Sequence, residues 1–128
     1  MKKMYIVLNE DIEDIMNNPG YACSQVAHAS FDALDTGLNK ALQYSINESI
    51  TLNKVYDLSY SNRNFRLDGN KIIILKTSQE KMETLNNLGC LTVIDRDKGG
   101  IMTAIYLGIH DEDKVPDFIK EMKLYGGE

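Results

Sequence analysis

The sequence of 128 residues has few cysteines and no long hydrophobic run. Its two cysteines, Cys23 and Cys90, are too few for the disulfide framework of a small secreted domain. The longest unbroken run of Ile, Leu and Val is the four residues Ile72 to Leu75, whereas a bilayer span needs roughly 20 apolar residues. No charged segment followed by an apolar stretch opens the chain as a secretory signal would. We therefore expect a soluble, cytoplasmic protein, and the length favours a single domain over residues 1–128.

Positive charge is also scarce, and it is unevenly spread. The chain carries 14 Lys and Arg against 19 Asp and Glu, a net charge of −5. The stretch from Lys54 to Lys76 has five bases and two acids, a net charge of +3, which leaves −8 for the rest of the chain. Because binding to a long nucleic acid depends on clustered Lys and Arg, we expect no such partner. A small anionic ligand at one local positive site remains compatible with these charges.

The sequence gives no signal for a metal site or a cofactor. His28 and His110 are far apart, and neither cysteine has a partner at CxxC spacing. No glycine-rich phosphate motif is present either, although Gly20 precedes a predicted helix and helix N-termini attract anions. We therefore expect no metal and no cofactor, and keep Gly20 as a weak candidate for ligand binding.

The hydrophobic pattern predicts alternating strands and helices. Four runs have the composition of strands, namely Met4–Asn9, Lys71–Lys76, Cys90–Ile94 and Thr103–Ile109, and Lys71–Lys76 has the composition of a central strand. Helices are predicted over Tyr21–Leu34 and over Leu38–Ser45, and Gly37 between them can end or kink the first. A third helix is predicted between Thr77 and Gly89, and a last one starts near Asp111.

The limits of the third helix have specific signals. Thr77 with Glu80 has capping-box spacing, and Gly89 is placed to end the helix. In the last helix, Pro116 falls in the first turns, and the apolar face consists of Phe118, Ile119, Met122 and Leu124.

The element order predicts an α/β fold with parallel pairing, and the short connection between the last two strands adds an antiparallel pair, so the sheet is expected to be mixed.

Two groups of polar residues are candidates for chemistry. Gln25 and His28 are neighbours on an otherwise small and apolar helix face; His28 is either a core histidine bonded to a backbone carbonyl or a functional group. The loop Asp95–Gly100 follows a strand directly, where α/β folds often place functional groups, and is otherwise a solvated loop with an Asp–Arg surface pair. As a catalytic carboxylate, Asp97 needs a proton donor or acceptor, for which Tyr21, His28 and Lys98 are the candidates.

Four segments, in order, resemble the type 2 peptidyl-tRNA hydrolase family. They are Gly20–Ala29, with Gln25 and His28-Ala29; Gly69–Lys76; Leu88-Gly89 followed by Asp97-Lys98-Gly99; and Leu107–Ile109 with Lys123–Tyr125. The resemblance covers nearly the whole chain apart from residues 47–68, which form an insertion or lid-like segment relative to the family. It implies a mixed four-stranded sheet flanked by helices, a tendency to form dimers, and hydrolysis of the ester between a peptide and the terminal ribose of tRNA.

The resemblance also implies which positions carry the activity. The family's proposed machinery is a lysine at the start of the first helix, the aspartate of Asp-Ala-Gly, and threonines in and after that loop. Asp97 matches the aspartate, whereas the lysine position holds Tyr21 and the first threonine position holds Ile101. Thr103 and Ile105 compete for the second threonine position. Loss of one such catalytic group typically costs roughly 10²–10³ in rate.

The first functional hypothesis is a binding protein derived from this fold. Tyr21 would stack on a base or ribose, and a segment from Tyr56 to Arg66 would close over the ligand, unless its tyrosines merely pack on the sheet as a hairpin or crossover. The ligand would be a tRNA end, a free nucleotide, or a cyclic or ADP-ribose-like signal molecule. In the last case the protein would sequester the molecule, as phage proteins directed against nucleotide signalling do. The candidate ligand-binding residues are Gly20, Tyr21, Gln25, Arg63, Phe65, Arg66, Lys98 and Thr103.

Two alternatives stand beside it. The chain could be a hydrolase of peptidyl-tRNA or of another nucleotide-linked ester or phosphodiester, with Asp97 as the base and His28 or Tyr21 in support. It could also be an interaction protein that uses the fold without a pocket. In each case a homodimer is expected.

Overall fold

The structure is a computed structural model that describes residues 1–46, 69 and 71–127, with only the backbone for 37–46. The predicted insertion at 47–68, with Arg63, Phe65 and Arg66, lies outside the described residues. The elements are β1 (Lys2–Asn9), α1 (Glu13–Asn17), α2 (Pro19–Ile46), β2 (Ile72–Thr77), α4 (Gln79–Asn87), β3 (Thr92–Asp95), the 3₁₀ turn η1 (Arg96–Lys98), β4 (Ile101–Asp111), the 3₁₀ turn η2 (Glu112–Lys114), α5 (Asp117–Lys120) and β5 (Lys123–Leu124).

The strands form one mixed sheet in the order β3-β4-β1-β2-β5. β1 runs parallel to β2, and the pairs β1–β4, β3–β4 and β2–β5 are antiparallel. The predicted α/β fold with a mixed sheet is confirmed, but the sheet has five strands instead of four. The additional strand β5 consists of two residues, which is too short to leave an alternating pattern in the sequence.

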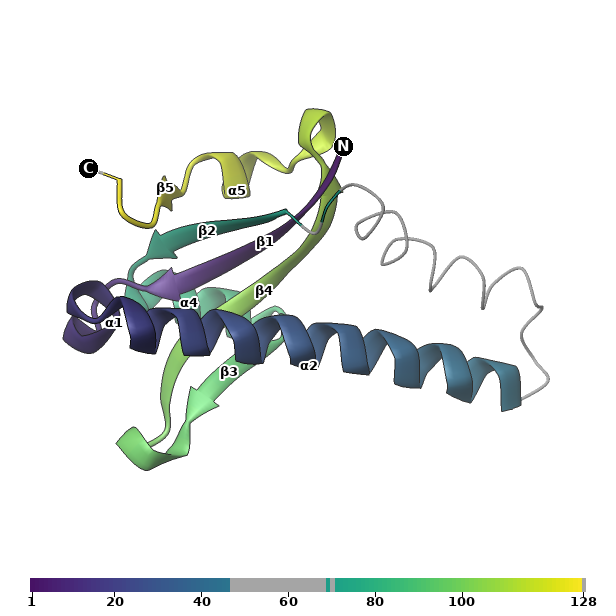
Figure 1. Cartoon of the computed structure of the whole chain (residues 1–128), viewed down its shortest axis with the longest axis horizontal. Coiled ribbons are helices and arrows are strands. Elements are labelled where there is room, and N and C mark those ends of the chain that lie inside the picture. The colour runs from purple at the N-terminus through teal and green to yellow at the C-terminus, as the bar shows by residue number, and fades with distance from the viewer. Residues whose placement is uncertain (47–68, 70, 128) are drawn as a thin grey trace.

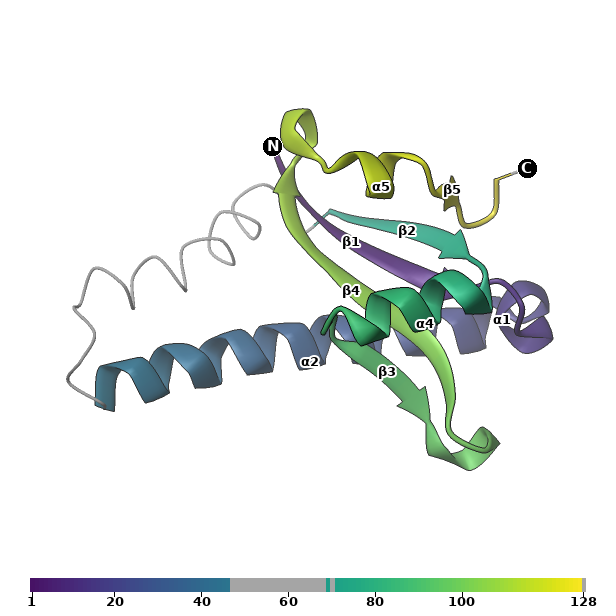
Figure 2. The same ribbon diagram turned by 180° about the vertical axis from the view of Figure 1, so that it is seen from behind.

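Helices cover both faces of the sheet (Figures 1 and 2): α2 lies across one face, and α4 and α5 lie on the other. Because successive strand residues point to opposite faces, β1 contributes to two cores. Met4, Ile6 and Leu8 pack with the α2 side, and Tyr5 and Val7 pack with the α4 and α5 side. Small residues on α2, namely Ala22, Val26 and Ala29, are buried against the sheet, as their spacing predicts.

The prediction of a central strand at Lys71–Lys76 is met only in part, because β2 lies between β1 and β5 but pairs with β5 at two residues. The central strand of the sheet is β1. On the side away from β1, β2 pairs with β5 only at Leu75 and Lys76. Ile72 is consequently 37% exposed, and Leu75 alone of the strand is buried. An all-aliphatic run fits a strand next to the edge as well as a central one, because composition does not report the number of hydrogen-bonded neighbours.

The first long helix differs from the prediction at both ends. It begins at Pro19, two residues before Tyr21, because the Asn18 side-chain oxygen accepts the Tyr21 N–H at 3.2 Å and proline is favoured at the first helical position. It then continues through Gly37 to Ile46 as one helix, so the expected break at Gly37 does not occur. A single glycine costs about 1 kcal/mol relative to alanine, which neighbouring turns offset.

The predicted capping box before α4 is also displaced by one residue. Thr77 still belongs to β2, where it pairs with Asn9, and the N-cap is Ser78, whose hydroxyl oxygen accepts the Lys81 N–H. The end of the helix is as predicted: Gly89 has φ +90°, and its N–H donates to the Asn86 carbonyl oxygen.

The predicted C-terminal helix is wrong beyond one turn. The chain forms η2, the four-residue α5 after Pro116, and then β5. Of the predicted apolar face only Ile119 is fully buried, and Phe118 and Leu124 are exposed. The helix stops because the backbone turns back to the sheet, where the Tyr125 N–H donates to the Ile74 carbonyl oxygen at 2.9 Å. Among the described residues, no helix is long and apolar enough to cross a membrane.

Candidate functional site

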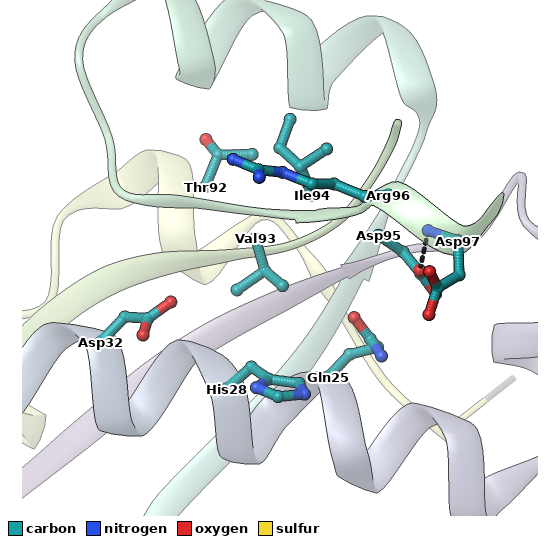
Figure 3. A pocket seen from close by; sticks show the side chains of 9 residues that line it. All are labelled: Gln25, His28, Asp32, Thr92, Val93, Ile94, Asp95, Arg96 and Asp97. Carbon is teal, nitrogen blue, oxygen red and sulfur yellow. Dashed lines mark hydrogen bonds between the residues drawn. The ribbon is translucent and has the colours of Figure 1, made fainter. Parts of the chain in front are cut away.

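An open groove of about 580 Å³ lies between α2 and the end of β3 (Figure 3). The strands β1, β2 and β3 run in the same direction, so this groove reaches the edge where their carboxyl ends meet, the usual place for ligands in open α/β sheets. Its lining residues are Gln25, His28, Asp32, Thr92, Val93, Ile94, Asp95, Arg96 and Asp97.

The helical wall of the groove is a stripe of polar residues. Gln25, His28 and Asp32 follow one another at intervals of three and four, which places them on one face of α2. His28 is exposed and points into the groove, so its interpretation as a buried core histidine is wrong. The apolar face of α2 that packs on the sheet lies beside this stripe, and His28 therefore remains open to solvent.

Gln25 differs from its neighbours because it is only 6% exposed and firmly held. Its Oε1 accepts the Thr103 hydroxyl at 2.7 Å, and its Nε2 donates to the Ser24 hydroxyl at 3.2 Å. Thr103 itself is fully buried beneath the groove and does not line it. The structure thus gives Thr103 a direct contact with Gln25, whose amide it orients.

Asp95 joins the start of α2 to the loop after β3. Its Oδ2 accepts the Tyr21 hydroxyl at 2.5 Å, and its Oδ1 accepts the Asp97 N–H at 3.1 Å. Burial, and then the hydrogen bond to Asp95, raise the pKa of Tyr21 above its ordinary value of 10.0. At neutral pH the phenol is therefore protonated, and its proton is directed to Asp95.

A cation lies next to this pair. Lys98 forms an ion pair with Asp14, and its Nζ is 4.1 Å from the centre of the Tyr21 ring. One face of that ring is consequently occupied, and a base could stack only on the other.

The family comparison bears on this arrangement. The model of the family described as peptidyl-tRNA hydrolase PTH2 matches residues 2–125. The chain belongs to the PTH2 family. No curated protein matches the chain. The resemblance carried by the four sequence segments is thereby confirmed, and it extends across both α2 and the Asp97 loop.

In this member of the PTH2 family, the residues predicted for catalysis share the groove. Asp97 and His28 both line it, and the Asp97 carboxylate makes no hydrogen bond to any other described residue. Of the three proposed proton partners of Asp97, Tyr21 is engaged by Asp95 and Lys98 by Asp14. His28 is the remaining one, and it faces the same space.

The predicted ligand-binding residues are spread more widely. Gln25 lines the groove, Tyr21 and Lys98 lie at its end beside Asp95, and Thr103 lies below it. Gly20 is exposed in the first turn of α2 and does not line the groove. Within the described part of the chain, no group of three or more His, Cys, Asp or Glu could hold a metal ion.

Sequence reasoning missed Asp32 of the groove in this PTH2 family member, and it included Asp95 and Arg96 in the candidate loop without giving either a role. Asp32 has a detectable signal, because it lies four residues after His28 on the same helix face. Asp95 ends β3, but its contact with Tyr21 spans 74 positions and leaves no local pattern. Arg96 lies in the predicted loop, and in Figure 3 its side chain runs along the outer side of β3, away from His28.

Proposed function

We propose that the groove binds a nucleotide-containing ligand, such as the end of a tRNA or a small nucleotide. The observation that carries the proposal is the convergence of Gln25, His28 and Asp97 on one groove of about 580 Å³, in a chain of the PTH2 family. That volume lies within the range of small-molecule sites, roughly 300–1,000 Å³. The fixed Gln25 amide suits the edge of a base, and carboxylates accept hydrogen bonds from ribose hydroxyls.

The charge of the groove specifies which part of the nucleotide it would hold. Three carboxylates line it, those of Asp32, Asp95 and Asp97, against the single guanidinium of Arg96, which lies along the outside of β3. A phosphate group would be repelled by this surface, whereas an uncharged nucleoside would not. We therefore assign the groove to the nucleoside end of the ligand, with its phosphates outside.

Hydrolysis of an ester on that nucleoside is the second candidate function. It is favoured by the Asp97 carboxylate, which makes no hydrogen bond to another described residue, and by Lys98. Lys98 lies beside Tyr21, and the family has a lysine at the position of Tyr21. Asp97, with His28 in support, would take a proton from water as the water oxygen bonds to the ester carbon. The bond from that carbon to the ribose oxygen then breaks, and the proton passes to the ribose oxygen. The Lys98 ammonium is a candidate to stabilise the negative charge that develops on the ester.

Calorimetry and a single-turnover assay separate these functions. Adenosine, AMP and a panel of cyclic and ADP-ribose-like nucleotides are titrated into the full chain, and diacetyl-lysyl-tRNA is incubated with micromolar protein. Asp97→Asn is compared with Asp113→Asn, an exposed aspartate of η2 outside the groove.

Each outcome has a distinct reading. Hydrolysis that falls roughly 10²–10³-fold in Asp97→Asn, but not in Asp113→Asn, identifies a hydrolase. Saturable binding without turnover identifies a binding or sequestering protein. No heat from any nucleotide and no hydrolysis would refute both functions and favour an interaction protein. Homodimer formation and a cytoplasmic location stay predictions.

A further inference from the structure

The strand β3 forms one edge of the sheet, and its outer side pairs with no described segment of the chain. In the strand order β3-β4-β1-β2-β5, β3 pairs with β4 alone. Edge strands present unpaired backbone groups to other chains, and proteins usually protect them with lysine, proline or a covering segment. The sequence of β3 is Thr-Val-Ile-Asp, which contains neither lysine nor proline.

The outward backbone groups of β3 follow from its hydrogen bonds on the inner side. The carbonyl oxygens of Leu91 and Asp95 each accept an N–H from β4 or from the turn that precedes it, both at 2.9 Å. Because the hydrogen-bonding direction alternates along a strand, Leu91, Val93 and Asp95 face β4. The N–H and C=O groups of Thr92 and Ile94 therefore point away from the sheet, where they make no hydrogen bond to another described residue.

The side of this edge that faces α2 is acidic. Val93 points toward α2 in Figure 3, so a strand added beside β3 would send every second side chain over the groove. These side chains would meet the exposed carboxylates of Asp32 and Asp97. Between residues 19 and 37, α2 carries no Lys or Arg that could neutralise the two carboxylates. Lysine and arginine are therefore favoured at these positions of an added strand.

The opposite side of the edge is apolar. Ile94 points away from α2 and is 45% exposed. The end of α4 lies beside the start of β3, because the Asn86 side-chain oxygen accepts the Thr92 hydroxyl at 2.9 Å, and Leu88 at this end is 76% exposed. The Arg96 side chain runs along the same side, so a lysine of an added strand is disfavoured there and an apolar residue is favoured.

We propose that the edge of β3 binds an extended segment of another protein in which basic and apolar residues alternate. The segment would add a strand to the sheet, held by the outward N–H and C=O groups of Thr92 and Ile94. A second copy of this chain is disfavoured as the occupant, because pairing of two β3 strands would bring together the carboxylates of Asp95 and Asp97 from both copies. This proposal does not depend on nucleotide binding by the groove.

NMR titration of the full, isotope-labelled chain tests the proposal with two capped six-residue peptides. One peptide alternates lysine with valine, and the other alternates glutamate with valine. The lysine peptide should cause saturable shifts of the Thr92 and Ile94 amide signals and slow the hydrogen exchange of both amides. The glutamate peptide should bind about tenfold more weakly or not at all, because it brings like charges to Asp32 and Asp97.

Two pairs of variants separate the backbone contribution from the charge contribution. Ile94→Pro removes an outward N–H and keeps the hydrogen bonds to β4, whereas Ile94→Val keeps the N–H. The proline variant should weaken binding of the lysine peptide about tenfold, and the valine variant less than about threefold. Asp32→Lys should weaken binding of the lysine peptide about three- to tenfold and strengthen binding of the glutamate peptide. Asp113→Lys on η2 makes the same change in net charge and should leave both affinities within about twofold.

The Asp32 and Asp113 variants decide the question if Ile94→Pro does not fold. Unchanged Thr92 and Ile94 amide signals at millimolar lysine peptide would overturn the proposal, and so would equal affinities for the two peptides. Slower exchange of these amides with rising protein concentration alone would also overturn it, because a second copy of the chain would then occupy the edge.

Discussion

The hydrogen bond between Tyr21 and Asp95 should be a measurable link between α2 and the loop that carries Asp97. The phenol donates to a carboxylate at 2.5 Å, and such charge-assisted bonds contribute about 1.5–3 kcal/mol when buried. Because both residues are half-buried, we expect Tyr21→Phe to lower the free energy of unfolding by about 1–2 kcal/mol. For a chain of this length that corresponds to a fall in Tm of about 4–8 °C.

Urea denaturation of a double-mutant cycle tests this value. The variants are Tyr21→Phe, Asp95→Ala and their combination, and Tyr106→Phe is the control, because its hydroxyl makes no hydrogen bond to another described residue. We expect a coupling free energy of about 1 kcal/mol or more between positions 21 and 95. A coupling below about 0.3 kcal/mol would refute the assigned bond.

The pH dependence of the same difference gives a second test. The pKa of Tyr21 is raised in the folded protein, so its contribution to stability is complete below the unfolded pKa of about 10 and is lost as pH rises towards the folded pKa. The stability difference between the parent chain and Tyr21→Phe should therefore be constant up to about pH 9 and shrink above pH 10. A difference that grows with alkaline pH would contradict the raised pKa.

Three further predictions concern the sheet and the groove. Thr103→Val should lower the free energy of unfolding, measured by urea denaturation, by about 1–3 kcal/mol because it removes the donor to the buried Gln25 oxygen. The control Thr84→Val, at an exposed position of α4, should lower it much less. Equal effects of the two substitutions would contradict the buried contact. Gly108→Ala should lower Tm more than Gly126→Ala. Both glycines have positive φ, but a Cβ at Gly108 would also lie 2.8 Å from His110 Nε2, whereas a Cβ at Gly126 would meet nothing within 4 Å. Equal changes in Tm would refute this steric contribution. The Lys3 hydrogen bond lowers the pKa of Glu112, so its stabilisation is present above about pH 4.5 and is lost as pH falls through the folded pKa. Lys3→Gln should therefore lower Tm at pH 7, and this deficit should shrink as pH falls below about 4.5, unlike the effect of Lys120→Gln. A deficit that stays constant on acidification would argue against the hydrogen bond.

The fold could be predicted where the sequence has strong local patterns. The strands that contain Val7, Leu75 and Ile105 are apolar runs, and the small residues of α2 mark its packing face. Prediction failed where tertiary contacts decide the structure. Thr77 stays in β2 because Asn9 pairs with it, and Leu124 forms a strand only because β2 offers an open edge.

The candidate site was predictable only in part for the same reason. Gln25 and Asp97 were predicted from family segments and chemistry, and the groove places them together. Asp95 was predicted only as part of the candidate loop, and its contact was not foreseen because it depends on Tyr21, which is distant in sequence. The burial of His28 was left open because the apolar residues around it do not specify which side of α2 the sheet covers.

The central place of β1 in the sheet has a consequence for synthesis. This strand is made first, yet its partners are residues 72–77 in β2 and residues 104–111 in β4. At a translation rate of about 5–20 residues per second, β1 waits roughly 5–20 seconds on the ribosome before its last partner is made. Until residues 72–77 are made, β1 has no strand of the sheet to pair with, and its pairing is complete only after β4. The nascent chain therefore depends on α2, which follows β1 directly, or on a chaperone, to cover the two apolar faces of this strand.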